Sequence, residues 1–322
     1  MKHVSIEIIR KCPNNCLHCS SLSGINCKEK IETELVKRVI DGLKKIKVEY
    51  ISLSGGEPFL HEGLIEIVQY ATNKGLKTNI YTSGVLLNNK SIPLEMLKQI
   101  KDAGVNKLIF NFQSLKEKVY DQIMNTRGNL KSVKKSIENS KTSGIYTELH
   151  FVPMKLNYNE ILDIVEYVKE NNIDKVSFLG LIPHGRAALN KDIIFLDKDI
   201  NNKVKALLDN IKNKKIRIGT PLSIKSEQCK CEAGKDKLYI KYDGKVYGCE
   251  AFKYIRLYDI EEVFPDSIYE KNIEDIYYNS KYLQVAQEKI DAILKNYTDE
   301  NCPIQEEIRE KNYRLIRRAK ND

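Results

Sequence analysis

Residues 48–71 read VEYISLSGGEPFLHEGLIEIVQYA, and this stretch contains the unit from which the fold is built. Val48–Leu53 is strand-like, with apolar residues bounded by turn formers. Leu64–Ala71 has apolar residues at helical spacing, and Gly75 follows it in the position of a helix C-cap. A turn-forming stretch, Ser54–Pro58, joins the two. The sequence here predicts a strand, a loop and a helix in series.

The same unit recurs through the first two thirds of the chain. The strand-like segments are Val4–Ile9, Val48–Leu53, Leu76–Tyr81, Val105–Phe112, Tyr146–Val152 and Lys175–Leu179. The helical segments are Ile31–Ile46 with Thr33 as N-cap, Leu64–Ala71, Leu94–Ala103, Lys116–Lys141, Glu160–Glu170 and Ile200–Ile211. Six strand–helix units in series imply a parallel sheet with right-handed crossovers. We therefore predict an α/β fold of the partial (β/α)6 barrel type, with the chemistry at the carboxyl ends of the strands.

The pattern changes after about Gly219, and we predict a boundary between a first domain over residues 1–219 and a second over residues 220–322. The second part begins with a hairpin and ends in helices: Lys237–Tyr242 and Lys245–Tyr247 flank Asp243-Gly244, and a long helical stretch runs from Ile273 to Leu294. An Asp-Gly pair between two strand-like runs is a strong hairpin signal.

Composition and charge exclude several classes of protein. Of the 322 residues, 42% are hydrophobic and 30% are charged, which is typical of a folded globular chain. The N-terminus lacks the apolar core of a secretory signal, and no apolar run approaches the roughly 18 residues that span a bilayer. We expect a cytoplasmic protein with no membrane partner. The net charge of +9 comes from lysines spread along the chain without a nucleic-acid motif, so we expect no nucleic-acid partner.

Three of the eight cysteines, Cys12, Cys16 and Cys19, have the spacing C-x3-C-x2-C in the loop after the first strand. Because the cytosol keeps thiols reduced, such clustering indicates metal binding rather than disulfides. A [4Fe–4S] cube has four irons, so three thiolates leave one iron free to bind a small molecule. A four-thiolate zinc site that adds Cys27 is an alternative that the spacing leaves open.

The cysteine loop resembles the signature of the radical S-adenosylmethionine (SAM) superfamily, in which an aromatic residue, here His18, precedes the last cysteine. Gly55-Gly56-Glu57-Pro58, at the end of the second strand, is similar to the second motif of that superfamily, which cradles the methionyl amino group of SAM. The resemblance implies that Cys12, Cys16 and Cys19 hold a [4Fe–4S] cluster whose open iron binds SAM.

The resemblance extends along the barrel. It implies that Thr82 and Ser83 line the SAM pocket after the third strand, that Ser114 after the fourth strand helps to bind SAM, and that Val152 on the fifth packs against adenine. For Thr82, Ser83 and Val152, an ordinary turn or core position is an equal alternative. Leu181 begins the segment LIPHGRA, which resembles the Pro-x-Gly-Arg segment of members with a cysteine-rich C-terminal extension.

Cys231 and Cys249 fit the pattern C-x12-G-x4-C, which resembles the start of the auxiliary-cluster module called SPASM. Only Cys302 follows, so the shorter, one-cluster form called twitch is the better match. The implied ligands of an auxiliary [4Fe–4S] cluster are Cys229, Cys231, Cys249 and Cys302. Cys229 and Cys231 are one residue apart, and we expect one of them, Cys229, to be a spare thiol that donates a hydrogen atom. A zinc knuckle and a structural cysteine are the alternatives.

The resemblance implies an enzyme in which an electron from the reduced cluster cleaves SAM to methionine and a 5′-deoxyadenosyl radical, which removes hydrogen from a substrate C–H bond. The favoured substrate is a ribosomally made peptide that receives a thioether, a carbon–carbon crosslink or an inverted stereocentre. Expected partners are an electron donor such as flavodoxin or ferredoxin and, because the first strand begins near residue 4, a separate leader-recognition protein. The alternatives are a small-molecule oxidoreductase, for example on an aminosugar, and a non-catalytic zinc scaffold.

Overall fold

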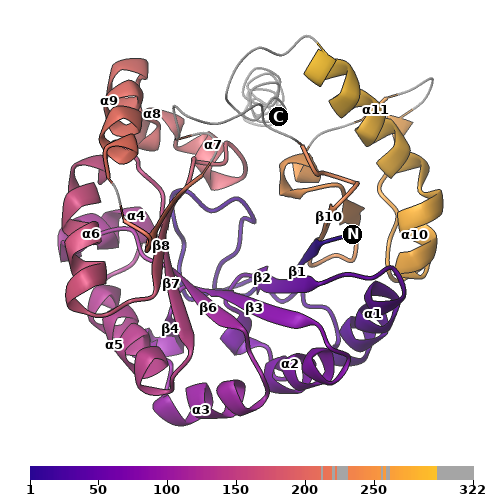
Figure 1. Ribbon diagram of the computed structural model, residues 1–322, viewed down its shortest axis with the longest axis horizontal. Helices are drawn as coiled ribbons and strands as arrows, with labels where there is room; N and C mark the ends of the chain where they lie inside the picture. Colours follow the sequence, from indigo (N-terminus) through magenta and orange to yellow (C-terminus); the bar gives the residue numbers. More distant parts are fainter. Residues whose placement is uncertain (212, 220–221, 223–230, 255–256, 259–261, 296–322) are drawn as a thin grey trace.

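The computed structural model describes residues 1–295 except for 212, 220–221, 223–230, 255–256 and 259–261. Within this part of the chain, the main sheet has nine strands in the order β11-β10-β1-β2-β3-β6-β7-β8-β9. All neighbours from β10 to β9 pair in parallel, and β11 pairs antiparallel with β10. The sheet curves without closing, and helices cover its outer face (Figure 1). The predicted α/β fold with an open parallel sheet is confirmed.

The six predicted strands are present within a few residues of their expected bounds. The strands of the main sheet are β1 His3–Ile9, β2 Tyr50–Gly55, β3 Lys77–Thr82, β6 Lys107–Asn111, β7 Tyr146–Phe151, β8 Lys175–Phe178, β9 Ile216–Ile218, β10 Lys237–Ile240 and β11 Val246–Tyr247. Two small hairpins are formed by β4 Val85–Leu86 with β5 Lys90–Ser91, and by β12 Leu257–Tyr258 with β13 Glu262–Val263.

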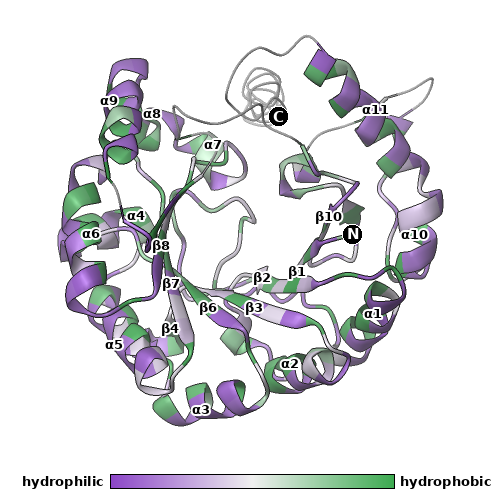
Figure 2. Ribbon diagram, viewed as in Figure 1, coloured by the Kyte–Doolittle hydropathy of each residue, from purple (hydrophilic) through white to green (hydrophobic). Residues whose placement is uncertain are grey.

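Helices follow most strands of the barrel. The α-helices are α1 Thr33–Lys45, α2 Leu64–Asn73, α3 Leu94–Asp102, α4 Glu117–Met124, α5 Asn129–Thr142, α6 Ile161–Glu170, α7 Arg186–Leu189, α8 Lys191–Ile194, α9 Lys198–Asp209, α10 Ile273–Asn279 and α11 Lys281–Lys295. Short 3-10 turns are η1 Pro58–Leu60, η2 Leu87–Asn89, η3 Tyr158–Glu160 and η5 Glu250–Tyr254. The helices carry both hydrophobic and hydrophilic residues (Figure 2), and their buried apolar residues belong to one core with those of the strands. Among the described helices, none is both long enough and apolar enough to cross a membrane.

Two expectations about helix boundaries were wrong. Thr33 is the first residue of α1, and the N-cap position is occupied by Glu32, whose side chain makes no capping bond. The helices expected between Lys116 and Lys141 are present as α4 and α5, which are separated where Asn125 and Gly128 take left-handed backbone angles. The C-terminal helical stretch breaks at Ser280, which is extended and accepts a hydrogen bond from Leu283 N at 3.2 Å. A serine in that position starts a new helix by satisfying an otherwise unpaired N–H.

The alternation of side chains along a strand separates the core from the barrel interior, and β7 shows this most clearly. Leu149 and Phe151 are fully buried in the hydrophobic core. Glu148 and His150, at the intervening positions, carry polar groups to the inside of the barrel, where each lines a cavity. The barrel interior is therefore a place for chemistry, while the apolar core lies between the sheet and the helices.

The C-terminal part extends the same sheet. β10 pairs in parallel with β1, with Ile6 opposite Ile240, so strands from both sides of residue 220 belong to one sheet. Near the pairing of β10 with β1, Lys253 of η5 is buried and its Nζ lies 3.1 Å from a carboxylate oxygen of Glu7 on β1. The boundary near residue 220 stays a prediction. The hairpin expected around Asp243-Gly244 is present as β10 and β11.

Candidate active site

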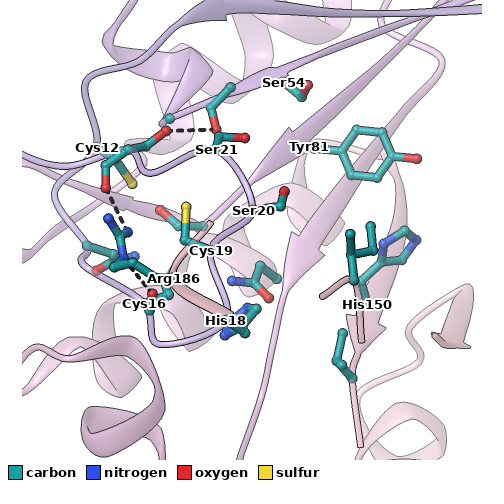
Figure 3. A pocket seen from close by; sticks show the side chains of 18 of the residues that line it. Cys12, Cys16, His18, Cys19, Ser20, Ser21, Ser54, Tyr81, His150 and Arg186 are labelled. Atoms are coloured by element: carbon teal, nitrogen blue, oxygen red, sulfur yellow. Dashed lines mark hydrogen bonds between the residues drawn. The ribbon is translucent and has the colours of Figure 1, made fainter. Parts of the chain in front are cut away.

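The cysteine loop, residues 10–32, joins β1 to α1 and lies over the carboxyl ends of the strands. Its start is fixed by a backbone hydrogen bond from Cys12 N to Gly24 O at 3.1 Å. Cys12, Cys16 and Cys19 all line one cavity of about 260 Å³. Figure 3 shows these three cysteines on the same side of the view, and all three line that cavity. The predicted grouping of these cysteines at the carboxyl rim is present in the structure.

Gly55 and Gly56 lie directly against the first residues of the cysteine loop. Gly56 N donates to Ile9 O at 2.6 Å, and the next amide donates to Lys11 O at 2.8 Å. A Cβ atom on Gly56 would lie 2.0 Å from Lys11 O, and one on Gly55 would lie 2.1 Å from Ile9 O. Gly55 also has φ +126°, which side chains disfavour. The two glycines are therefore required by the close approach of two backbones, and both line the cavity.

Glu57 is fully buried, and its carboxylate holds the end of β3. It accepts hydrogen bonds from Thr82 Oγ1 at 2.7 Å, Ser83 N at 2.8 Å and Ser83 Oγ at 2.5 Å. Burial raises the pKa of Glu57, against hydrogen bonds from Ser83 and Thr82 that lower it. Thr82 and Ser83 line the cavity, whereas Glu57 and Pro58 lie behind it, Pro58 as the first residue of η1. A direct role of Glu57 and Pro58 in binding SAM stays a prediction.

Arg186, at the start of α7, fastens the cysteine loop from the other side. Its Nε donates to Cys16 O at 2.8 Å and its Nη2 donates to Ser23 O at 2.7 Å. The preceding Gly185 has φ +56°, and a Cβ there would lie 2.6 Å from Cys19 O. Figure 3 shows Arg186 beside Cys16, with dashed lines for its hydrogen bonds. The segment that begins at Leu181 thus holds the cysteine loop in place.

We expect Arg186→Met to loosen the cysteine loop, because it removes two hydrogen bonds made by a charged group, each of which is typically worth about 1.5–3 kcal/mol. The measurement is the rate at which a chelator removes iron from the reconstituted protein, which should rise at least tenfold. Arg38→Met is a matched control, since Arg38 lies on α1 outside the cavity lining. Equal iron loss in the two variants would contradict the role given to Arg186.

The remaining predicted residues differ in their relation to the cavity. Val152 and Leu181 line it, as does His18. Ser114 does not: its hydroxyl group faces Glu160, with distances of 2.8 and 2.9 Å to the two carboxylate oxygens. The role of Ser114 in binding SAM therefore stays a prediction, and its observed contact is structural.

Several cavity residues were not predicted from the sequence. They are Asn14, Ser20, Ser21, Ser23, Ser54, Tyr81, Ile109, Asn111, His150, Leu179, Gly180, Ile182 and Arg186. Strand alternation was the available signal for one of them, because His150 lies two residues before Val152 and must share its face.

His18 is buried beside Asn111, and their side chains share a hydrogen bond. Burial lowers the pKa of His18 to about 4 despite this hydrogen bond. His18 Nδ1 is buried without a partner among the described residues.

The donor set fits an iron–sulfur cluster. Burial raises the pKa of Cys16 to about 12 and raises the pKa of Cys12 well above its usual value, so iron would have to displace the thiol protons, as metals do at cysteine sites. Among the described residues, no three His, Cys, Asp or Glu side chains gather closely enough to hold a single ion. A cube spreads its thiolates over several irons, so it does not need them to meet at one point. Cys27 lies outside the cavity lining, with its Sγ 3.8 Å from Leu22 O.

Two of the four cysteines expected to hold an auxiliary cluster are described. Cys231 and Cys249 are half-buried, and neither lines the cavity. Their segments are neighbours, because Gly234 N donates to Gly248 O at 3.1 Å. Cys229 and Cys302 lie outside the described residues. The auxiliary ligand set and the hydrogen-donor role of Cys229 stay predictions.

A model of the radical SAM superfamily matches residues 6–168, which include the cysteine loop, the paired glycines and the strands up to β7. The chain therefore belongs to the radical SAM superfamily, whose members use a [4Fe–4S] cluster and SAM.

Known relatives cover more of the chain than this core. The chain is 28% identical to PqqA peptide cyclase of Bradyrhizobium diazoefficiens over 81% of its own length and 69% of the relative. It is 24% identical to the subtilosin biosynthesis protein AlbA of Bacillus subtilis over 94% of its own length and 65% of the relative. Streptococcus suis SuiB, solved with its precursor peptide SuiA, has the same fold, with TM-score 0.72 and 18% identity over 88% of this chain and 65% of SuiB. The chain thus spans about two thirds of each relative.

Proposed function

We propose that this radical SAM enzyme modifies a ribosomally made peptide. The observation that carries the proposal is the extent of the match to PqqA peptide cyclase, which covers 81% of the chain and so continues beyond the superfamily core into the C-terminal part. AlbA matches over 94% of the chain and acts in the biosynthesis of a bacteriocin. SuiB, whose likeness concerns the fold, is a case in which this architecture holds a precursor peptide.

We assign Cys12, Cys16 and Cys19 as the cluster ligands, with the backbone of Gly55-Gly56 beside them. When bound, the cluster and SAM supply a 5′-deoxyadenosyl radical that removes hydrogen from an unactivated C–H bond. The protein's own part is positioning: Glu57 fixes the Thr82-Ser83 turn, and Arg186 fixes the cysteine loop. Val152 and Leu181 give the cavity an apolar wall that keeps water from a reactive intermediate.

We further propose that Cys229, Cys231, Cys249 and Cys302 hold an auxiliary cluster that serves the peptide rather than SAM. Cys231 and Cys249 lie outside the SAM cavity lining, which supports a separate role. We expect Cys249→Ala to keep some cleavage of SAM but to yield no modified peptide. The check is liquid chromatography of 5′-deoxyadenosine and mass spectrometry of the peptide from one reaction. Full peptide modification by Cys249→Ala would refute the auxiliary-cluster assignment.

The proposed partners are a reduced flavodoxin or ferredoxin as electron donor and a separate protein that recognises the peptide leader. The test is anaerobic co-expression of the chain with each short open reading frame beside its gene, followed by mass spectrometry of the peptide. A crosslink appears as the loss of two hydrogen atoms, and epimerisation appears after digestion and chiral analysis. If the neighbouring genes instead encode carbohydrate enzymes and an aminosugar is oxidised, the enzyme acts on small molecules. Protein that contains zinc and no iron would indicate a scaffold.

A further inference from the structure

The wall of the cavity away from the cysteines carries a histidine bound to a buried carboxylate. Figure 3 shows Tyr81 and His150 on the side of the view opposite the labelled cysteines, and all of these residues line the cavity. Glu148 is two residues before His150 on β7, so both side chains point to the barrel interior. His150 Nε2 lies 3.3 Å from Glu148 Oε1. The Glu148 side chain is 2% exposed, whereas that of His150 is 13% exposed and reaches the cavity.

Glu148 is held as a carboxylate by groups from the two neighbouring strands. Lys107 Nζ on β6 lies 2.6 Å from Glu148 Oε2, and Ser177 Oγ on β8 donates to Oε1 at 2.5 Å. Burial alone would raise the pKa of Glu148, but hydrogen bonds from His150, Lys107 and Ser177 outweigh it and lower the pKa well below its usual value. Three donors on one carboxylate are typical of a group that stays ionised near neutral pH.

The ionised carboxylate determines the tautomer of His150. A carboxylate accepts hydrogen bonds and donates none, so Nε2 carries the imidazole proton and Nδ1 keeps its lone pair. The pKa of His150 is lowered, mainly by burial and also by the positive charges of Arg217 and Lys107. Glu148 raises this pKa but does not outweigh these effects. Tyr81 from β3 contacts the imidazole edge-on, with ring centroids 5.3 Å apart. The cavity is thus lined by a neutral, oriented imidazole with a basic nitrogen.

We propose that His150 accepts a proton from the peptide held in the cavity. This inference rests on the proposed function and narrows it to the formation of a crosslink. In the proposed step an N–H, O–H or S–H bond of the peptide breaks, its electron pair stays on the heteroatom, and the proton bonds to His150 Nδ1. The resulting imidazolium is stabilised by the Glu148 carboxylate. Epimerisation needs a hydrogen-atom donor instead and has no use for this base.

Glu148 and Lys107 act through His150 and are positioning residues. A nearby carboxylate typically fixes the imidazole ring and stabilises its protonated form, as in other histidine–carboxylate pairs. The groups that set the charge on His150 come from four strands: Glu148 on its own strand, Lys107 on β6, Arg217 on β9 and Tyr81 on β3. Loss of Glu148 should lower the pKa of His150 further, because the hydrogen bond and the negative charge by which Glu148 raises that pKa would be gone.

The first readout of the test does not depend on turnover. Diethylpyrocarbonate, which modifies unprotonated imidazole, is applied to the reconstituted enzyme, and the tryptic peptide Thr142–Lys155 is analysed because His150 is its only histidine. We expect modification of His150 with a pH midpoint below the ordinary value of about 6.5. In Glu148→Gln the midpoint should fall further. An unreactive His150, or a midpoint at or above the ordinary value, would overturn the proposal.

The second readout uses SAM and the precursor peptide found by co-expression. In His150→Gln, the yield of crosslinked peptide per 5′-deoxyadenosine should fall about 100-fold or more, the usual contribution of a general base. In the wild-type enzyme this yield should decline toward acid pH as His150 is protonated, and the variant should lack that decline. His3→Gln is the matched control, since His3 lies at the amino end of β1 outside the SAM cavity lining. An unchanged yield in His150→Gln refutes the base, whereas wild-type enzyme that forms 5′-deoxyadenosine but modifies no peptide refutes the proposed function.

Discussion

Gly56→Ala is expected to abolish cluster binding and to lower the free energy of unfolding by about 3 kcal/mol, the upper range for overpacking a tight site. The added Cβ would lie 2.0 Å from Lys11 O and 2.6 Å from Arg10 O. Both obstacles are backbone atoms, so rotation of a side chain cannot relieve the clash. The start of the cysteine loop must move away, and Cys12 moves with it. Urea unfolding and iron content after anaerobic reconstitution measure the two effects.

Gly24→Ala is the matched control for this prediction. Gly24 belongs to the same loop and pairs with its first residues, but a Cβ there would meet no atom within 4 Å. Its backbone is not in the left-handed region, so alanine fits without strain. We expect normal stability and a normal iron content. Cluster binding by Gly56→Ala at the level of Gly24→Ala would show that the close approach of the two backbones is not required.

Lys253→Met is expected to lower the free energy of unfolding by about 3–5 kcal/mol, because it leaves a carboxylate without its cation in a dry site. Lys253 and Glu7 are each only 1% exposed, and Nζ lies 3.1 Å from the carboxylate. The same Nζ reaches Ser21 Oγ at 3.1 Å and Tyr239 OH at 2.9 Å. The pair thus ties η5 and β10 to β1 and to the cysteine loop, and its loss should also loosen that loop.

A double-mutant cycle separates the pair from its surroundings. Adding Glu7→Gln to Lys253→Met removes the uncompensated charge and should restore much of the lost stability. Lys45→Met is the control for a surface ion pair. It breaks the pair between Lys45, whose side chain is 71% exposed, and Glu274, and it should change the free energy of unfolding by no more than about 1 kcal/mol. Urea denaturation followed by circular dichroism gives the five values needed, for the wild type, Lys253→Met, Glu7→Gln, the double variant and Lys45→Met. Equal losses in Lys253→Met and Lys45→Met would show that the buried pair contributes no more than a surface one.

The barrel could be predicted because its signals are local and repeated. Each strand can be recognised by apolar residues between turn formers, and the alternation of strands with helices indicates a parallel sheet. The helix boundaries were harder to predict from the sequence. The break at Asn125–Gly128 depends on left-handed backbone angles, and the pairing of β10 with β1 joins residues more than 200 positions apart. Periodicity within a segment cannot report such a long-range contact.

Site residues could be predicted from the sequence where a short motif contains the reactive groups. They could not be predicted where a side chain depends on contacts with residues far away in the sequence. Cys12, Cys16 and Cys19 could be identified from their spacing, and the structure places them on one cavity. The hydrogen bond from Arg186 to Cys16 joins residues 170 positions apart. The carboxylate of the Glu148–His150 pair is kept ionised by Lys107 and Ser177, which lie on other strands. Ser114 was expected to help bind SAM; its hydroxyl group contacts Glu160, and its role in binding SAM stays a prediction. The sequence contains the reactive groups, but tertiary structure determines which of them meet.

The central claim is that Cys12, Cys16 and Cys19 hold a cluster that binds and cleaves SAM. The most direct measurement is anaerobic reconstitution of wild-type enzyme and Cys16→Ala, with iron and sulfide counted and 5′-deoxyadenosine measured after reduction with dithionite. We expect about eight irons per wild-type chain if both proposed cubes form, and about four if only the first does. Wild-type enzyme should cleave SAM, and Cys16→Ala should not. Normal cleavage by Cys16→Ala, or a wild-type protein that binds zinc and no iron, would contradict the claim.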